Sequence, residues 1–316
     1  MTVFGFIAAR KTEHSVKTMC RVLGVSRSGF HAWQRRAPSR RALEDERLTE
    51  RIREIHAENR RVYGSPRVHA ELVLGDGERI GRKRVERLMR VAGISGLIRR
   101  RRGRTTVRVP GVRVCDDLVD RAFAAEAPNR IWVADITYLR TWQGWLYLVA
   151  VQDLYSRRIV GWSMADHMRT ELVSDALQMA LAQRRPGPGL IWHSDQGSQF
   201  VSLAFGQQAR AAGIAQSMGS RGDCYDNSVA ESFFATLKKE LVDRRSWPEG
   251  AELRTEIFDF IEIFYNRRRR HSTLGMLSPI DYENSALDPG GSRDAASRLR
   301  SNEKMTITAT AATINA

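Results

Sequence analysis

The middle of the chain contains three consecutive segments rich in β-branched and aromatic residues, at residues 131–140, 146–155 and 158–164. Gly144 lies in the short link between the first two segments and suits a hairpin turn. Strands joined by links this short pair as an antiparallel meander. An amphipathic helix at 170–183, a short apolar strand at 190–193 and a helix at 202–212 follow. This order predicts an α/β domain in which helices flank a sheet. Two further long helices are predicted, at residues 227–243 and 250–266.

The composition is that of an ordinary folded protein. With 316 residues, of which 42% are hydrophobic and 28% charged, the chain suffices for roughly two domains of about 150 residues each. No apolar run approaches the roughly 18 residues that a membrane helix needs, and the apolar stretch at 3–9 lacks the basic segment of a secretion signal. Cys20, Cys115 and Cys224 are too far apart for a metal pair or a disulfide framework. We therefore expect reduced thiols, a cytoplasmic protein and no membrane association.

Basic residues are concentrated in the N-terminal third. Residues 1–114 hold 28 Lys and Arg against 11 Asp and Glu, a net charge of +17, whereas the rest holds 23 against 25, a net charge of −2. A charge imbalance of this size favours a polyanionic partner. Basic tails that serve only solubility explain it less well, because this third also has helical apolar patterns. We infer that the N-terminal third binds nucleic acid, while the remainder does something that needs carboxylates.

Residues 15–33 read as two short helices separated by a turn at 23–25. Ser26 is a suitable N-cap for the second helix. This pattern predicts a helix-turn-helix domain in residues 1–40. Its second helix presents Arg27, Ser28 and His31 near its N-terminal end, where a recognition helix meets base edges in the major groove. A purely structural helical hairpin has the same pattern, but the surrounding positive charge favours DNA.

A second helical domain is predicted for residues 41–98. It has a long first helix, a turn at 63–68 in which Pro66 opens the next helix, and a final helix near 82–92. The final helix packs through an apolar face and carries basic residues elsewhere; these are Arg82, Lys83, Arg84, Arg87 and Arg90. A solvated charged face has the same pattern. However, a run of arginines follows directly, at Arg99, Arg100, Arg101 and Arg102, so we predict phosphate contacts for this helix and for a basic linker at 99–127.

Three acidic residues occupy positions where a carboxylate is costly. Asp135 lies in the middle of a predicted strand, Asp195 follows an apolar strand, and Glu231 lies one turn into a helix with apolar neighbours. A buried carboxylate must be paired or bind a metal. Alone, each is more simply explained as a hydrogen-bonded core Asp or a surface Glu. Their spacing is more informative, because 59 residues separate Asp135 from Asp195 and 35 separate Asp195 from Glu231.

This spacing resembles the Asp, Asp, thirty-five residues, Glu signature of the transposase and retroviral integrase superfamily, whose core is a ribonuclease H-like fold. Longer blocks also match: WVADITYL around Asp135, WHSDQGSQF around Asp195, SRGDCYDNSVAESFFATLKKEL around Glu231 and FYNRRRRHSTLGMLSPIDYE near the C-terminus. The chain is similar in these blocks, and in YGSPRVHAEL at residues 63–72, to the second reading-frame product of the bacterial insertion sequence three family. The resemblance covers about residues 15–283.

The resemblance implies a ribonuclease H-like mixed sheet core flanked by helices, at residues 128–285, with a tail at 286–316 that is expected to be disordered. It implies a DDE transposase in which Asp135, Asp195 and Glu231 bind two Mg²⁺ ions, which Mn²⁺ can replace, and catalyse DNA cleavage and strand transfer. The expected partners are the terminal inverted repeats, target DNA, further copies of the chain on DNA and an upstream reading-frame product. The expected location is the cytoplasm, at the nucleoid.

Other polar residues receive specific interpretations. Lys238 lies two helical turns after Glu231, on the same face, and suits a DNA phosphate, although Lys239 is an alternative and a solvated lysine is the simplest explanation. His193 is more simply a core histidine than a metal ligand. Asp226 and Asn227 suit helix caps, and Asp223 is left without a role. A basic cluster at a helix end is expected both to bind DNA and to favour the helix dipole; it comprises Arg267, Arg268, Arg269 and Arg270.

Two other classes of protein remain possible from the residues. A non-catalytic DNA-binding regulator accounts for the helix-turn-helix but leaves the three carboxylates unexplained. A ribonuclease H-type nuclease accounts for the carboxylates but does not need the basic N-terminal third. Joining of a 3′-hydroxyl end to target DNA in the presence of Mg²⁺ separates a transposase from both.

Overall fold

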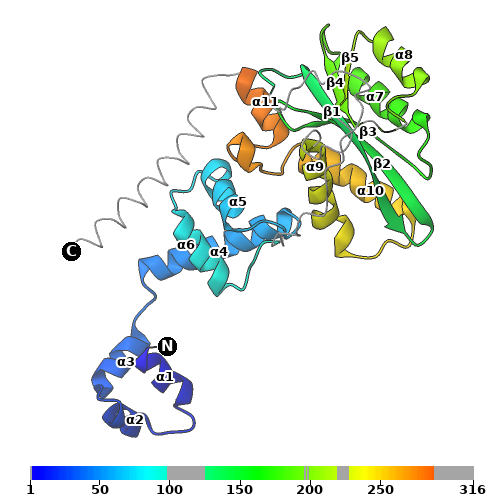
Figure 1. Cartoon of the computed structure of the whole chain (residues 1–316). Helices are drawn as coiled ribbons and strands as arrows, with labels where there is room; N and C mark the ends of the chain where they lie inside the picture. Colours follow the sequence, from blue (N-terminus) through cyan, green and yellow to red (C-terminus); the bar gives the residue numbers. More distant parts are fainter. Residues whose placement is uncertain (1, 98–124, 196, 198, 219–227, 288–316) are drawn as a thin grey trace, which may run out of the picture. The chain divides into compact units, whose positions relative to one another are not determined.

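The structure, a computed structural model, describes residues 2–97, 125–195, 197, 199–218 and 228–287. The chain divides into two compact units, with the boundary between Arg51 and Ile52 (Figure 1). Several sequence-based predictions lie outside the described residues: Arg99 to Arg102, Cys115, Asp223, Cys224, Asp226, Asn227 and the tail from residue 288. The five-part division into domains stays a prediction.

The first unit contains the expected helix-turn-helix. Helices α2 (Val16–Val22) and α3 (Arg27–Arg35) are joined by a turn in which Gly24 has φ 66°. Ser26 caps α3, since its side chain accepts a hydrogen bond of 2.9 Å from the Gly29 amide. A further helix, α1 (Val3–Arg10), was not predicted; its Ile7 joins Met19, Cys20 and Phe30 in the core of the unit.

The second unit begins within α4 (Arg40–Glu58), which runs through the boundary. The predicted turn and helix follow as α5 (Ser65–Ala70), which has Pro66 in its first turn and continues into a π-helical stretch, η1 (Glu71–Gly75). Helix α6 (Arg82–Val91) buries Val85, Leu88 and Met89, as its apolar pattern predicts.

A five-stranded mixed sheet forms the centre of the second unit, in the order β3-β2-β1-β4-β5. The strands are β1 (Ile131–Thr141), β2 (Gly144–Asp153), β3 (Ile159–Ala165), β4 (Ile191–Ser194) and β5 (Ala215–Met218). The first three pair antiparallel, whereas β4 pairs parallel to both β1 and β5. The meander and the strand after it are therefore confirmed, while β5 was missed because its sequence AQSM lacks the apolar run that marks β4.

Helices cover the sheet, as Figure 1 shows. Helices α7 (Thr170–Arg184) and α8 (Leu203–Ala211) bury their apolar faces in one core with alternate β1 residues such as Trp132 and Ala134. Strand β3 and α7 lie so close together at Gly161 that a Cβ there would be 2.3 Å from the Ala176 carbonyl oxygen. The ribonuclease H-like mixed sheet flanked by helices is confirmed.

The C-terminal part of the second unit is helical. Helix α9 (Ser228–Glu240) is followed by the short η2 (Val242–Arg244), by α10 (Gly250–Phe258), which continues into the π-helical η3 (Asp259–Tyr265), by η4 (Ser272–Leu274) and by α11 (Pro279–Leu287). The two long helices were predicted close to these bounds. Within the described ranges, no helix is both long and apolar enough to cross a membrane.

Candidate active site and DNA-contacting residues

The pairing of β1 with β4 brings the first two acidic residues together. The parallel register matches Ala134 with Ser194, so Asp135 and Asp195 each lie one residue beyond this pair. Adjacent strands are about 4.8 Å apart and residues in register share a face of the sheet. The two side chains line one cleft of about 710 Å³, together with Tyr138, Trp145 and Gln199.

Helix α9 brings the third acidic residue to the same face. Val229 and Ala230, in the first turn of α9, pack against Val133, which precedes Asp135 by two residues and therefore projects from the same face of β1. Glu231 follows in this first turn and is exposed. Lys238, seven residues later, lies on the same side of the helix, and its Nζ atom lies 5.3 Å from the centre of the Tyr138 ring.

The electrostatics of Asp135 link these groups. Burial raises the pKa of Asp135 to about 7; the Ile136 amide, which donates a hydrogen bond of 2.7 Å to Oδ1, opposes this shift, and the charges of Asp195 and Glu231 reinforce it. Lys238 also lowers the pKa of Asp135, so all three partners lie within electrostatic reach of this carboxylate. Two neighbouring carboxylates disfavour the ionised form of Asp135, which shows that negative charge is concentrated here.

The burial predicted for the three carboxylates is only partly correct. Asp135 is half-buried, but Asp195 and Glu231 are exposed, because one follows the end of a strand and the other lies on the solvent side of α9. Asp195 accepts a hydrogen bond of 3.1 Å from the Gly197 amide. Within the part of the chain that the structure describes, no three His, Cys, Asp or Glu side chains are gathered closely enough to hold a metal ion. The three charges interact without forming a closed ligand set.

Aromatic residues beside the carboxylates were not selected from the sequence. Tyr138 and Trp145 are cross-strand neighbours with a ring-centre distance of 5.2 Å, and they are 60% and 50% exposed. Large exposed aromatic rings next to a cleft are a surface on which nucleic-acid bases stack. The alternation along β1 and β2 is the sequence signal for them, but it does not reveal which rings remain exposed.

His193 is a core histidine. It is buried in β4, and its Nδ1 atom lies 3.0 Å from the Ser217 hydroxyl of β5. The side chain therefore links two strands and is buried in the core, in agreement with the simpler of its two interpretations.

The arginine cluster after η3 requires a correction. Arg267 and Arg268 are exposed, as DNA contact requires, but Arg269 is buried and donates two hydrogen bonds, of 2.8 and 2.7 Å, to the Glu240 carboxylate. Arg270 is also turned inward and donates a hydrogen bond of 2.7 Å to Glu71. Two of the four guanidinium groups are therefore in internal ion pairs, because residues 266–268 form a turn and the next two arginines reach Glu240 of α9 and Glu71 of η1.

The other basic residues lie where surface contact is possible. Arg27, Ser28 and His31 are exposed on α3, while Phe30 fixes that helix to the core. On α6, Arg82, Lys83 and Arg87 are exposed and Arg84 is half-buried. The arginines at 99–102 lie outside the described residues. DNA contact by any of these groups stays a prediction.

Comparisons with protein families match both the sheet domain and the helical region that precedes it. A family described as "Integrase core domain" matches residues 125–224, and a second of the same description matches residues 212–279. A family described as "HTH-like domain" matches residues 43–102. The two integrase core matches together cover the sheet and α9, and the HTH-like match covers the helices from α4 to α6.

Among solved structures, the chain is similar to a chain of a simian T-cell lymphotropic virus intasome in complex with a PP2A regulatory subunit, with a TM-score of 0.43, 13% identity and 74% of each chain covered. The catalytic core domain of HTLV-2 integrase in complex with magnesium gives a TM-score of 0.38 at 18% identity, over 50% of this chain and 98% of that one.

Curated relatives are much closer in sequence. The chain is 42% identical over 264 residues to the "Insertion element IS600 uncharacterized 31 kDa protein" of Shigella sonnei, covering 84% of this chain and 97% of that protein. It is 39% identical over 284 residues to "Transposase InsF for insertion sequence IS3A" of Escherichia coli (strain K12), covering 89% and 98%. The chain therefore belongs to the IS3 family of transposases, DNA-binding enzymes of the polynucleotidyl transferase type with an integrase core.

Proposed function

We propose that this transposase uses Asp135, Asp195 and Glu231 as a DDE triad to cleave DNA at the inverted-repeat ends of a bacterial insertion sequence and to join those ends to target DNA. The observation that carries the proposal is the arrangement of these three side chains. They come from the centre of β1, from the residue after β4 and from the first turn of α9, and the charges of Asp195 and Glu231 act on Asp135.

The donor set suits Mg²⁺. Three carboxylates offer only oxygen ligands, which hard divalent cations prefer. The charges of Asp195 and Glu231 add to the effect of burial in raising the pKa of Asp135, and a bound cation would offset this repulsion. We propose that these residues hold two Mg²⁺ ions, or Mn²⁺ in their place. When bound, such ions activate a water or a 3′-hydroxyl and stabilise the leaving oxygen in an in-line displacement at phosphorus.

The protein's own residues position the DNA. Lys238 lies beside the carboxylates and over the Tyr138 ring, where its ammonium group neutralises a phosphate next to the reacting one. Tyr138 and Trp145 offer stacking surfaces at the mouth of the cleft. These side chains bind and orient the substrate, and no covalent protein intermediate is needed.

The remaining contacts and partners complete the proposal. Recognition of the inverted repeats is assigned to Arg27, Ser28 and His31 of α3. Phosphate contacts are assigned to the basic residues Arg82, Lys83, Arg84, Arg87, Arg99, Arg100, Arg101, Arg102, Arg267 and Arg268. Several copies of the chain assemble on the DNA, alone or with an upstream reading-frame product, at the nucleoid in the cytoplasm.

The test compares two matched variants. Glu231→Gln keeps the shape of the side chain but removes the charge that holds a metal ion. Glu171→Gln makes the same change at another exposed Glu, in the first turn of α7. On a labelled repeat end with Mg²⁺, and then with Mn²⁺, we expect no joined product from Glu231→Gln, wild-type yield from Glu171→Gln, and unchanged DNA binding by both.

The outcomes separate the three classes of protein. Joining by Glu231→Gln at the wild-type yield excludes the triad. DNA binding by the wild-type chain with neither cleavage nor joining favours a regulator. Cleavage without joining favours a nuclease.

A further inference from the structure

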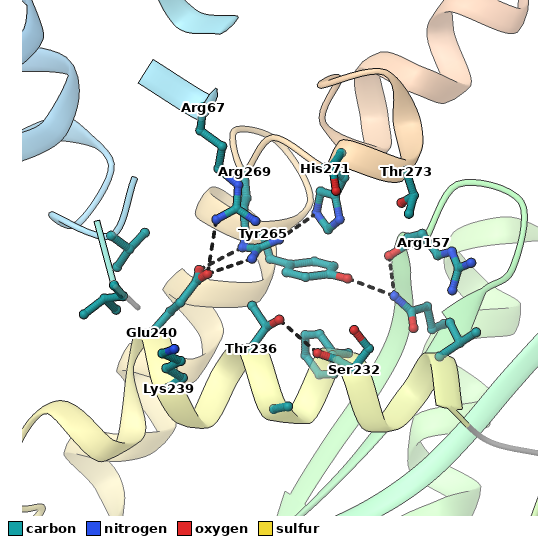
Figure 2. A pocket seen from close by; sticks show the side chains of 17 residues that line it. Arg67, Arg157, Ser232, Thr236, Lys239, Glu240, Tyr265, Arg269, His271 and Thr273 are labelled. Carbon is teal, nitrogen blue, oxygen red and sulfur yellow. Dashed lines mark hydrogen bonds and ion pairs between the residues drawn. The ribbon is translucent and has the colours of Figure 1, made fainter. Parts of the chain in front are cut away.

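A second cavity, of about 390 Å³, lies on the side of α9 away from the proposed active site. Figure 2 shows α9 along one wall, with Ser232, Thr236 and Lys239 turned inward, and the segment from Arg269 to Thr273 along the other. Glu231, a member of the proposed triad, and Lys238 do not line this second cavity. The two cavities share no lining residue. The cavity is therefore separate from the cleft of Asp135.

The lining of this cavity has more positive than negative charge. Among the described residues, its cationic groups are Arg67, Arg157, Lys239 and Arg269, and its one carboxylate is Glu240. Glu240 is already shared, since Arg269 donates two hydrogen bonds to it and the Arg67 guanidinium lies 3.6 Å away. The charge of Glu240 is thus already paired with two arginines.

Arg157 lines the cavity and has a guanidinium group without a partner among the described residues. Its guanidinium makes no hydrogen bond or ion pair with any residue that the structure describes, and it is half-buried. Its backbone has φ 62°, the left-handed region that few residues other than Gly, Asn and Asp adopt readily. The conformation is held by the Asp153 carbonyl, which accepts from the Arg157 amide at 2.9 Å, and by Gln152 Nε2, which donates to the Arg157 carbonyl at 2.7 Å.

The groups around Arg157 suit a bound anion from outside the chain. Ser232, Thr236 and Thr273 bring hydroxyl groups to the lining. The Thr236 hydroxyl donates to the Ser232 carbonyl at 2.9 Å, which leaves those of Ser232 and Thr273 as donors. Burial, together with the charges of Arg269, Arg67 and Arg157, lowers the pKa of His271 well below its ordinary value, so its ring is uncharged at neutral pH. Hydroxyls and guanidinium groups around a small concave site are the donors that bind phosphate oxygens.

We propose that this cavity binds a phosphate group, held by Arg157 and the Ser232 hydroxyl of α9, on the opposite side of that helix from the carboxylate triad. A phosphodiester of bound DNA and free phosphate share this chemistry. DNA is the source that the enzyme meets, so a backbone phosphate seated here ties α9, which carries Glu231, to the nucleic acid.

The test uses Arg157→Asn in the full chain, because Asn tolerates a positive φ and removes the charge. Arg185→Asn is the matched control, since Arg185 is exposed, has φ 43° and does not line the cavity. The probe is inorganic phosphate, followed by NMR of ¹³C-labelled histidine rings, with the His271 signal assigned from a His271→Gln variant. Wild type and Arg185→Asn should show a saturable shift of the His271 signal, which Arg157→Asn should lose. Thermal unfolding checks that all variants are folded.

A second arm replaces phosphate with duplex DNA carrying a repeat end. A matching shift with DNA that disappears in Arg157→Asn assigns the site to a DNA phosphate, and a shift with phosphate alone assigns it to a free anion. A wild-type chain without a response to either probe, or an unchanged response in Arg157→Asn, overturns the proposal. The result is independent of the proposed triad, because Glu231→Gln should respond as wild type does.

Discussion

Lys238 and Lys239 are neighbours in sequence but lie in different environments. Lys238 lies over the Tyr138 ring and within electrostatic reach of Asp135, whereas Lys239 lines the separate cavity on the other side of α9. Adjacent helical residues point about 100° apart, so the two lysines cannot serve the same phosphate. Of the two lysines considered from the sequence, the structure favours Lys238 at the proposed active site.

We predict that Lys238→Ala lowers the yield of strand transfer roughly tenfold, because one charge-assisted contact to a phosphate contributes about 1.5–3 kcal/mol. The loss relative to wild type should shrink as salt concentration rises, since a chain with one phosphate contact fewer has a shallower salt dependence. Lys239→Ala, measured in the same assay, should retain most of the activity. Equal losses in both variants would contradict the assignment of Lys238 to the reacting DNA.

At the scale of elements, α11 is attached to the sheet by one carboxylate. Glu283 accepts hydrogen bonds of 2.8 and 3.0 Å from Arg184 of α7, and it also binds Arg158 and Ser156 after β2. Burial on its own raises the pKa of Glu283, but the hydrogen bonds from Arg184 and Ser156 outweigh it, so the pKa is lowered. Three segments are therefore linked by an ionised side chain.

The ionised Glu283 should make stability depend on pH. A carboxylate with a lowered folded pKa stabilises the fold above its unfolded pKa, and this contribution is lost as pH falls through the folded pKa. Glu283→Gln should therefore reduce the free energy of unfolding by about 3–5 kcal/mol at pH 7, and the difference from wild type should shrink below the ordinary pKa of 4.5. Asp153, which lies 3.6 Å from Arg184 and has a pKa raised by burial, is present in both the wild type and the variant.

Urea unfolding at several pH values measures this difference. Glu252→Gln is a suitable control, because Glu252 pairs with Arg245 at the surface, where the side chains are 41% and 48% exposed, and such pairs contribute about 0–1 kcal/mol. A Glu283→Gln difference that stays constant from pH 7 to pH 3 would show that Glu283 is held by packing and not by charge.

At the scale of the whole molecule, the second helical domain is part of the same compact unit as the sheet. The Tyr63 hydroxyl accepts from the Arg270 amide at 2.8 Å, and Arg60 lies 2.8 Å from Glu256. Removing residues 1–114, the division suggested by charge, would expose these contacts and unfold part of the core. A cut before Ser39, whose hydroxyl accepts from the Ala42 amide at the start of α4, leaves the second unit intact.

Deleting residues 1–38 should weaken DNA binding more than Glu231→Gln does. This segment contains the helix-turn-helix and has 7 basic residues against 1 acidic residue. Each lost phosphate contact should lower the slope of log affinity against log salt by about 0.9. Fluorescence anisotropy with repeat-end DNA at several salt concentrations measures both quantities. Equal affinity and an equal slope for the truncated chain would show that this unit does not bind the DNA.

Sequence alone determined most of the order of elements, although α1 and β5 were missed, and it supplied the residues of the proposed triad. Strands, capped helices and short turns depend on local patterns, so the meander, the helix-turn-helix and the N-cap Ser26 were predictable from neighbouring residues. The spacing of the acidic residues could be read in the same way, because each follows or occupies an element whose place in the chain is locally determined.

Only the tertiary structure decided which charges face inward. Arg269 resembles its neighbour Arg267 in sequence, yet one pairs with Glu240 in the interior and the other is exposed. The partner lies far along the chain, and so do the partners of Arg60 and Glu283. Burial and pairing depend on contacts between distant segments, which no local pattern encodes; the same physical reason explains why the cavity at Arg157 could be found only once β2, α9 and η3 were packed together.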